Sequence, residues 1–146
     1  MHGLIPSGKA QRQWTLRASV RYIRVLGGPP GAEALLVGLR NGEALYVYVH
    51  QELPVPLLQH RIGIVCMDVS AERNSLAIID EEKELNIYNL PSKCRSYSQQ
   101  ECTSVAWHAS MDDLLAVTGT RTLFIKAGKL TKECRWVLCY SKAMQV

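Results

Sequence analysis

Length, composition and charge place this chain among ordinary soluble domains. Its 146 residues are 47% hydrophobic and 21% charged, which is enough apolar material for a core, and the formal net charge is +4. No apolar run approaches the roughly 20 residues of a membrane-spanning helix, and residues 1–9 lack the apolar region of a signal peptide. With no secretory signal, the five cysteines indicate reduced thiols, and we predict a soluble, intracellular protein.

Short apolar runs recur along the chain and predict β-strands. They are about four to seven residues long and rich in Val, Ile, Leu and Tyr, the residue types that strands favour. In chain order the expected strands are residues 20–26, 34–39, 44–49, 64–69, 76–79, 85–90, 104–107, 114–117 and 123–125. Many of these runs have apolar residues at adjacent positions, so both of their faces need cover. Packed layers of sheet would provide that cover.

Two stretches rich in glycine predict the first turns. Residues 27–31 contain Gly-Gly-Pro-Pro-Gly, in which proline cannot donate to a ladder and glycine supplies freedom of φ, so this is a loop. Asn41-Gly42 lies between two apolar runs, and both residues tolerate positive φ. We therefore predict a β-hairpin across residues 34–49, although residues 31–37 alone have good helix propensity.

An internal repeat indicates how the strands are organised. The segment from Val69 aligns without a gap with the segment from Trp107, about 38 residues later. Leu76 then falls on Leu114, and Leu85 falls on Leu123. Both copies run strand, polar connection, strand, tight turn, strand, and a looser copy covers residues 20–49. Three copies at a spacing of roughly 38–44 residues match the four-stranded blade of a β-propeller.

The predicted fold is all-β, a partial β-propeller of about three blades that is incomplete as a closed ring. We expect a flexible N-terminus over residues 1–11, blades over residues 12–128 and a divergent tail over residues 129–146. Within that tail, the run 136–140 would supply a last strand. Three blades leave two open sheet faces. We therefore expect a piece of a longer protein, a truncated product, or a protein completed by a partner.

The stretch from His60 to Asn89 resembles a WD repeat over one full repeat. His60 falls at the position of the repeat's histidine, Tyr88-Asn89 stands where Trp-Asp would be, and Glu82 occupies the position of the acid in the hairpin turn. The resemblance implies structural roles for these four residues. Gln59 replaces the usual glycine, and the third copy has Lys126-Ala127 at the Trp-Asp position. The predicted blades are therefore degenerate WD40-like blades.

Residues 19–31 and 35–42 carry a more specific resemblance, which continues through residues 66–71 and 104–107. They look like the WD-repeat subunits of intraflagellar transport complex A, over roughly residues 12–127. The resemblance implies a non-enzymatic scaffold that supports cilium assembly, retrograde intraflagellar transport and ciliary protein localisation. It also implies the other complex A subunits as partners, and a place in the cytoplasm and the cilium, at the basal body and axoneme.

The chain contains no pattern typical of a catalytic, cofactor or metal site. Zinc sites use closely paired ligands such as Cys-x-x-Cys, and the nearest pairs here are Cys134 with Cys139 and Cys102 with His108. Cys66 lies in an apolar run, which favours an inert thiol over a nucleophile assisted by His60. The loop 27–31 lacks the Gly-Lys-Ser/Thr ending of a phosphate loop. We predict no catalytic residue, no cofactor, no metal and no small-molecule substrate.

Two alternatives remain open from the residues alone. One is a WD-like propeller in another assembly, such as a coat complex or a ubiquitin-ligase receptor. The other is a nucleic-acid or lipid-binding module, because Trp14 and Tyr22 are interleaved with arginines in the basic N-terminal part. We favour the scaffold over nucleic-acid binding, since residues 17–25 alternate as an edge or outer strand with its polar side chains in water. The partner-binding surface cannot be assigned from the sequence.

Overall fold

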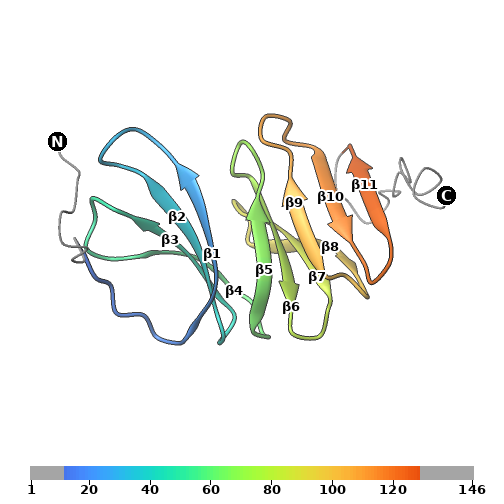
Figure 1. Cartoon of the computed structure of the whole chain (residues 1–146), viewed down its shortest axis with the longest axis horizontal. Coiled ribbons are helices and arrows are strands. Elements are labelled where there is room, and N and C mark those ends of the chain that lie inside the picture. The colour runs from blue at the N-terminus through green and yellow to red at the C-terminus, as the bar shows by residue number, and fades with distance from the viewer. Residues whose placement is uncertain (1–11, 129–146) are drawn as a thin grey trace.

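Three separate antiparallel sheets make up the part of the chain that the structure, a computed structural model, describes, which is residues 12–128 (Figure 1). Blade I contains β1 (Val20–Gly27), β2 (Ala34–Leu39), β3 (Glu43–Tyr48) and β4 (Val55–Gln59). Blade II contains β5 (Ile64–Val69), β6 (Ser75–Asp80), β7 (Leu85–Asn89) and β8 (Cys94–Gln99). Blade III contains β9 (Ser104–Trp107), β10 (Leu114–Thr118) and β11 (Leu123–Ala127). Residues 1–11 and 129–146, including the run 136–140, lie outside the described residues.

The blades lie side by side as successive sectors of a propeller. In each blade the strands follow chain order, and the first strand is the inner one. The three inner strands, β1, β5 and β9, are neighbours and point the same way (Figure 1). The sheets do not close into a ring, and no helix occurs between residues 12 and 128. The predicted all-β fold, a partial propeller of about three blades, is confirmed.

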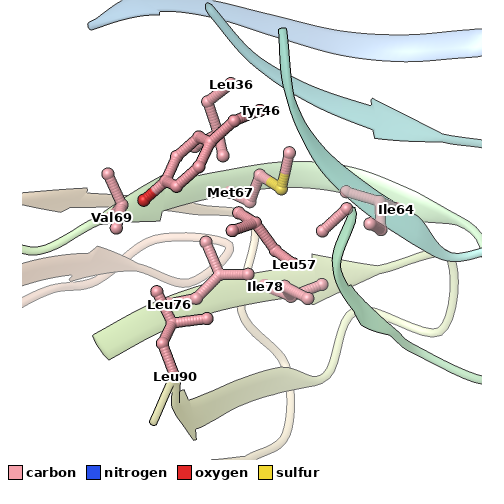
Figure 2. Close-up of a cluster of buried hydrophobic side chains, with 10 residues drawn as sticks. Leu36, Tyr46, Leu57, Ile64, Met67, Val69, Leu76, Ile78 and Leu90 are labelled. Atoms are coloured by element: carbon pink, nitrogen blue, oxygen red, sulfur yellow. The ribbon is translucent and has the colours of Figure 1, made fainter. Parts of the chain in front are cut away.

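Blade II is apolar on both faces because it is sandwiched between the other two blades. Along its strands, neighbouring side chains point to opposite faces of the sheet, one toward blade I and the next toward blade III. Toward blade I lie Ile64, Met67, Val69, Leu76 and Ile78, which pack against Leu36, Tyr46 and Leu57 (Figure 2). Toward blade III lie Cys66, Ala77, Ile79, Leu85 and Ile87, which pack against Val105, Trp107, Leu115 and Val117. This alternation explains the continuous apolar runs of β5 and β6.

The outer face of blade I is partly covered by the chain's own segment before β1. Trp14, Leu16 and Ala18 pack against the buried residues of β2 and β3 on that face, which are Val37, Leu39, Leu45 and Val47. The Trp14 indole N–H donates to the carbonyl oxygen of Gln51 at 3.1 Å. One of the two sheet faces expected to be open is therefore partly closed within the chain.

The hairpin predicted at Asn41-Gly42 is confirmed, with β2 ending at Leu39 and β3 beginning at Glu43. Gly42 has φ of +90°, and its carbonyl oxygen accepts the N–H of His60 at 2.8 Å. A Cβ at this position would lie 1.9 Å from the carbonyl oxygen of His60. Glycine is therefore required here both for the turn and for the close approach of the connection between blades I and II.

Nine of the strands lie where apolar runs predict them, but β4 and β8 are not among those runs. Both are the outermost strands of their blades. The interpretation of residues 17–25 as an edge or outer strand, with its polar side chains in water, is incomplete. β1 is an edge strand, but it is the inner one, and it exposes Ile23 and Val25 as well, at 56% and 70%.

Candidate functional site

A buried histidine connects blade I to blade II at the end of the propeller where β5 begins. His60 is 2% exposed and lies in the connection between β4 and β5. Its Nδ1 lies 2.7 Å from the Tyr88 hydroxyl, and its Nε2 lies 2.9 Å from Asp80 Oδ2. The ring also packs edge-to-face against Tyr88. Both ring nitrogens of this buried side chain are thus satisfied, as burial of a polar group requires.

The acid that contacts His60 is Asp80, not the expected Glu82. Asp80 is the last residue of β6, is 1% exposed, and its other oxygen, Oδ1, accepts the N–H groups of Glu82 and Glu84 at 2.9 and 3.1 Å. Glu82 is exposed in the turn that Asp80 closes. Asn89 is also exposed, and its Oδ1 accepts hydrogen bonds from the N–H and hydroxyl of Ser92. The structure therefore brings His60 and Tyr88 together and leaves Glu82 and Asn89 apart from them.

A second buried carboxylate joins all three blades at the opposite end of the inner strands. Asp68 of β5 is 2% exposed. Its Oδ2 accepts the N–H of Trp107 on β9 at 2.7 Å, while its Oδ1 accepts the N–H of Val69 at 2.9 Å and lies 3.0 Å from Nε of Arg24 on β1. The Trp107 indole N–H donates back to the Asp68 carbonyl at 3.1 Å. Asp68 thus ties the ends of β1, β5 and β9 together.

The environment of Asp68 acts on its ionisation in two opposing ways. Burial raises the pKa of the carboxyl above its ordinary value, because the charged form loses hydration. The N–H of Trp107, the Arg24 guanidinium and the N–H of Val69 lower the pKa, but they offset burial only in part. The net direction is upward, so the ionised carboxylate is held in the junction at a cost.

A cavity of about 210 Å³ opens beside this junction. Its walls come from the ends of the three inner strands and from the loops that follow β5 and β9. The side chains that bear charge or hydrogen-bonding groups there include Arg24, Asp68, Arg73, Trp107 and His108. Sequence reasoning missed this site. The available signal was an aspartate inside the otherwise apolar run Ile64–Val69, since a carboxylate in a buried strand needs partners.

The remaining chemical candidates lie apart from one another. Cys66 is buried between blades II and III, with its Sγ 3.8 Å from the Ser104 hydroxyl. The loop after β1 connects two strands of one sheet, so no helix follows it. Within residues 12–128, no group of three or more His, Cys, Asp or Glu side chains is arranged to hold a metal ion. In the same residues, no helix is long and apolar enough to span a bilayer.

Antiparallel blades of four strands, or of three in the described part of blade III, stack through apolar faces, and a buried histidine–acid pair joins blades I and II; these features define a WD-repeat propeller. Solved propellers share this fold. The chain matches the crystal structure of the RRP9 WD40 repeats with a TM-score of 0.53 at 16% identity, covering 82% of this chain and 42% of that one. It matches the C-terminal WD40 domain of Sif2 with a TM-score of 0.54 at 19% identity, covering 74% and 31%.

The family follows from sequence comparison. The model of the IFT122 second β-propeller matches residues 2–139, and the chain belongs to this family. It is 39% identical over 121 residues to the intraflagellar transport protein 122 homolog of Homo sapiens, and 38% identical over 120 residues to that of Xenopus tropicalis. These alignments cover 83% and 82% of the chain. The chain spans about a tenth of the length of these curated relatives.

Proposed function

We propose that this chain acts as a non-enzymatic scaffold segment in intraflagellar transport complex A, binding other subunits of that complex. In this role it supports cilium assembly, retrograde intraflagellar transport and the localisation of proteins to the cilium. Its place of action is the cytoplasm and the cilium, at the basal body and axoneme. The match of the IFT122 second β-propeller model over residues 2–139 carries the proposal.

The geometry supports binding rather than catalysis. Blades stacked through wide apolar faces form a rigid framework, and the loops at the ends of the inner strands are exposed on it. The conspicuous polar clusters, His60 with Asp80 and Asp68 with Trp107, are buried at junctions between strands or blades and have their hydrogen bonds made internally. Groups used in this way hold blades in register, and side chains at exposed loops remain available to partners.

We also propose that His60 and Tyr88 perform the structural role of the WD-type positions, with Asp80 as their acid. The hydrogen bonds from both ring nitrogens of His60 support this role, because they fix the connection between blades I and II against the turn after β6. Asn89 holds the turn after β7 through its hydrogen bonds with Ser92. Glu82 is exposed in the turn after β6, and its side chain would tolerate substitution.

Affinity purification tests the scaffold proposal. The full 146-residue chain, epitope-tagged, is expressed in ciliated cells, and co-purifying proteins are identified by mass spectrometry. We expect complex A subunits to be recovered with the wild-type chain and with Glu82→Ala, whose side chain is exposed. Leu115→Asp places a charge in the buried interface between blades II and III, and it should abolish recovery by unfolding the scaffold.

A folded wild-type chain that recovers no complex A subunit would contradict the proposal. Circular dichroism and a thermal melt of the purified chain establish that it is folded. Retention on RNA or anionic liposomes that falls with added salt, without recovery of complex A subunits, would favour a basic binding module instead.

A further inference from the structure

The cavity beside Asp68 is lined by several side chains that carry hydrogen-bond donors, among them Arg24, Arg73 and His108. The carboxylate of Asp68 is its conspicuous acceptor, but both of its oxygens already receive hydrogen bonds, from Val69, Trp107 and Arg24. Asp112 and Glu72 lie on the adjoining loops. Asp112 accepts the N–H of Glu72, and the Glu72 carboxylate accepts the amide of Asn74. Asp68 is thus the one carboxylate among the residues that line the cavity, and it is already engaged.

Two guanidinium groups line the same cavity, and each is in contact with a buried side chain. The Arg24 side chain is 43% exposed, with its Nε 3.0 Å from Asp68, and it also interacts with the Tyr22 hydroxyl. Arg73 lies over the ring of Tyr46, with its Cζ 5.6 Å from the ring centroid. Tyr46 is buried between blades I and II beside Val69 (Figure 2). A cation held over an aromatic face loses less freedom when it binds a ligand.

His108 adds a further hydrogen-bond donor to the wall of the cavity. Its Nδ1 accepts the backbone N–H groups of Ser110 and Met111 at 3.1 and 3.0 Å. A ring nitrogen that accepts two N–H groups carries no proton, so the ring proton lies on Nε2. The Nε2–H is therefore a donor, and the loop after β9 holds the exposed ring in one orientation.

We propose that this cavity binds a carboxylate side chain of an acidic peptide segment in a protein partner. The inference deepens the proposed scaffold function and rests on it, because it assigns that function a contact surface at the ends of β1, β5 and β9. Arg73 and the terminal nitrogens of Arg24 would bind the carboxylate oxygens, with His108 as a further donor. A cavity of about 210 Å³ is large enough for one such side chain.

The charge of the lining favours a carboxylate over a phosphate group. Two arginines oppose the single negative charge of Asp68, which leaves one net positive charge when His108 is neutral. A carboxylate carries one negative charge and would balance the lining. A phosphate group carries up to two, and the second would be repelled by the buried charge of Asp68.

Fluorescence anisotropy with a labelled peptide of four consecutive glutamates, flanked by glycine and serine, tests the proposal on the full 146-residue chain. We expect saturable binding, and no binding to the matched glutamine peptide. Arg73→Gln should weaken binding about tenfold, because it removes a charge-assisted hydrogen bond. His108→Gln should weaken it less. Raising sodium chloride to about 0.5 M should weaken it several-fold, because salt screens exposed charges.

Arg121→Gln is the matched control. Arg121 is an exposed arginine in the turn between β10 and β11, at the opposite end of the propeller from the cavity. Its loss removes the same charge and should change binding less than about twofold, since isolated surface charges contribute little. A thermal melt of each variant checks that Arg73→Gln remains folded.

Three results would overturn the inference: no binding of the glutamate peptide, equal weakening by Arg121→Gln and Arg73→Gln, or displacement of the peptide by inorganic phosphate at lower concentration than by free glutamate peptide. Failure of the scaffold proposal is separate, since it is measured by recovery of complex A subunits. A chain that binds the glutamate peptide through Arg73 but recovers no complex A subunit keeps this inference and loses the proposed assembly.

Discussion

Replacing Asp68 by alanine should destabilise the fold by about 1–4 kcal/mol. The change leaves the buried N–H of Trp107 without its acceptor, which costs roughly 1–3 kcal/mol. It also removes the ion pair with Arg24, which is worth only about 0.2–1 kcal/mol because the Arg24 side chain is 43% exposed. Asp68→Asn should lose about half as much as Asp68→Ala, since its amide oxygen can still accept one of these hydrogen bonds.

Urea unfolding monitored by tryptophan fluorescence and circular dichroism measures this loss in the purified chain. The midpoint should fall while the slope of the transition stays constant, as expected when stability changes but the buried area does not. Glu82→Ala is the control, and it should lie within about 0.5 kcal/mol of wild type because its side chain is exposed. A loss below about 1 kcal/mol for Asp68→Ala, or an equal loss for Asn and Ala, would refute the reasoning.

The same junction predicts a dependence of stability on pH. Burial raises the pKa of folded Asp68 above its ordinary value of 3.8. A raised folded pKa contributes stability that is fully present below 3.8 and is lost as the pH rises through the folded value. Asp68→Asn cannot titrate, so wild type should exceed it in free energy of unfolding by more at low pH than at neutral pH. A difference that grows toward neutral pH would contradict the upward shift.

Three further changes test the other buried contacts. Asp80→Ala should destabilise the chain by about 3–5 kcal/mol, because it leaves His60 Nε2 and the turn N–H groups without their acceptor. Glu82→Ala should not, and urea midpoints compare the two. Tyr88→Phe removes only the hydroxyl beside His60 Nδ1 and should cost about 1–2 kcal/mol in the same assay. Gly42→Ala should lower the melting temperature strongly or prevent folding, because its Cβ would meet a backbone oxygen at 1.9 Å; a melt close to wild type would show that the turn can shift.

The first three strands of each blade could be predicted, and the fourth strands of blades I and II could not. β5 and β6 are apolar on both faces because both faces are covered. β4 and β8 lie at the outer edges of their sheets, where one side of the strand faces water and selection for apolar residues is weak. Pro56 in β4 is a further misleading signal, since proline is tolerated at a sheet edge where its missing N–H is not needed.

The acid of the histidine cluster shows why spacing along the chain was insufficient. The resemblance to a WD repeat places Glu82 at the position of the turn acid, but the side chain that reaches His60 is Asp80. Asp80 is the last residue of β6, on the face that packs toward blade I, and Glu82 lies beyond the strand in the turn. The position where β6 ends therefore determines which acid points inward.

Blade II has two neighbours, and each of its flanking blades has one neighbour among the described residues. Stability in such an array is approximately a sum over blades and over the interfaces between them. A substitution in β6 that disturbs Ile78 weakens the interface with blade I, and one at Ile79 weakens the interface with blade III. Loss of blade II as a whole would remove both interfaces at once. Among the described residues, the middle blade therefore couples the two flanking blades energetically.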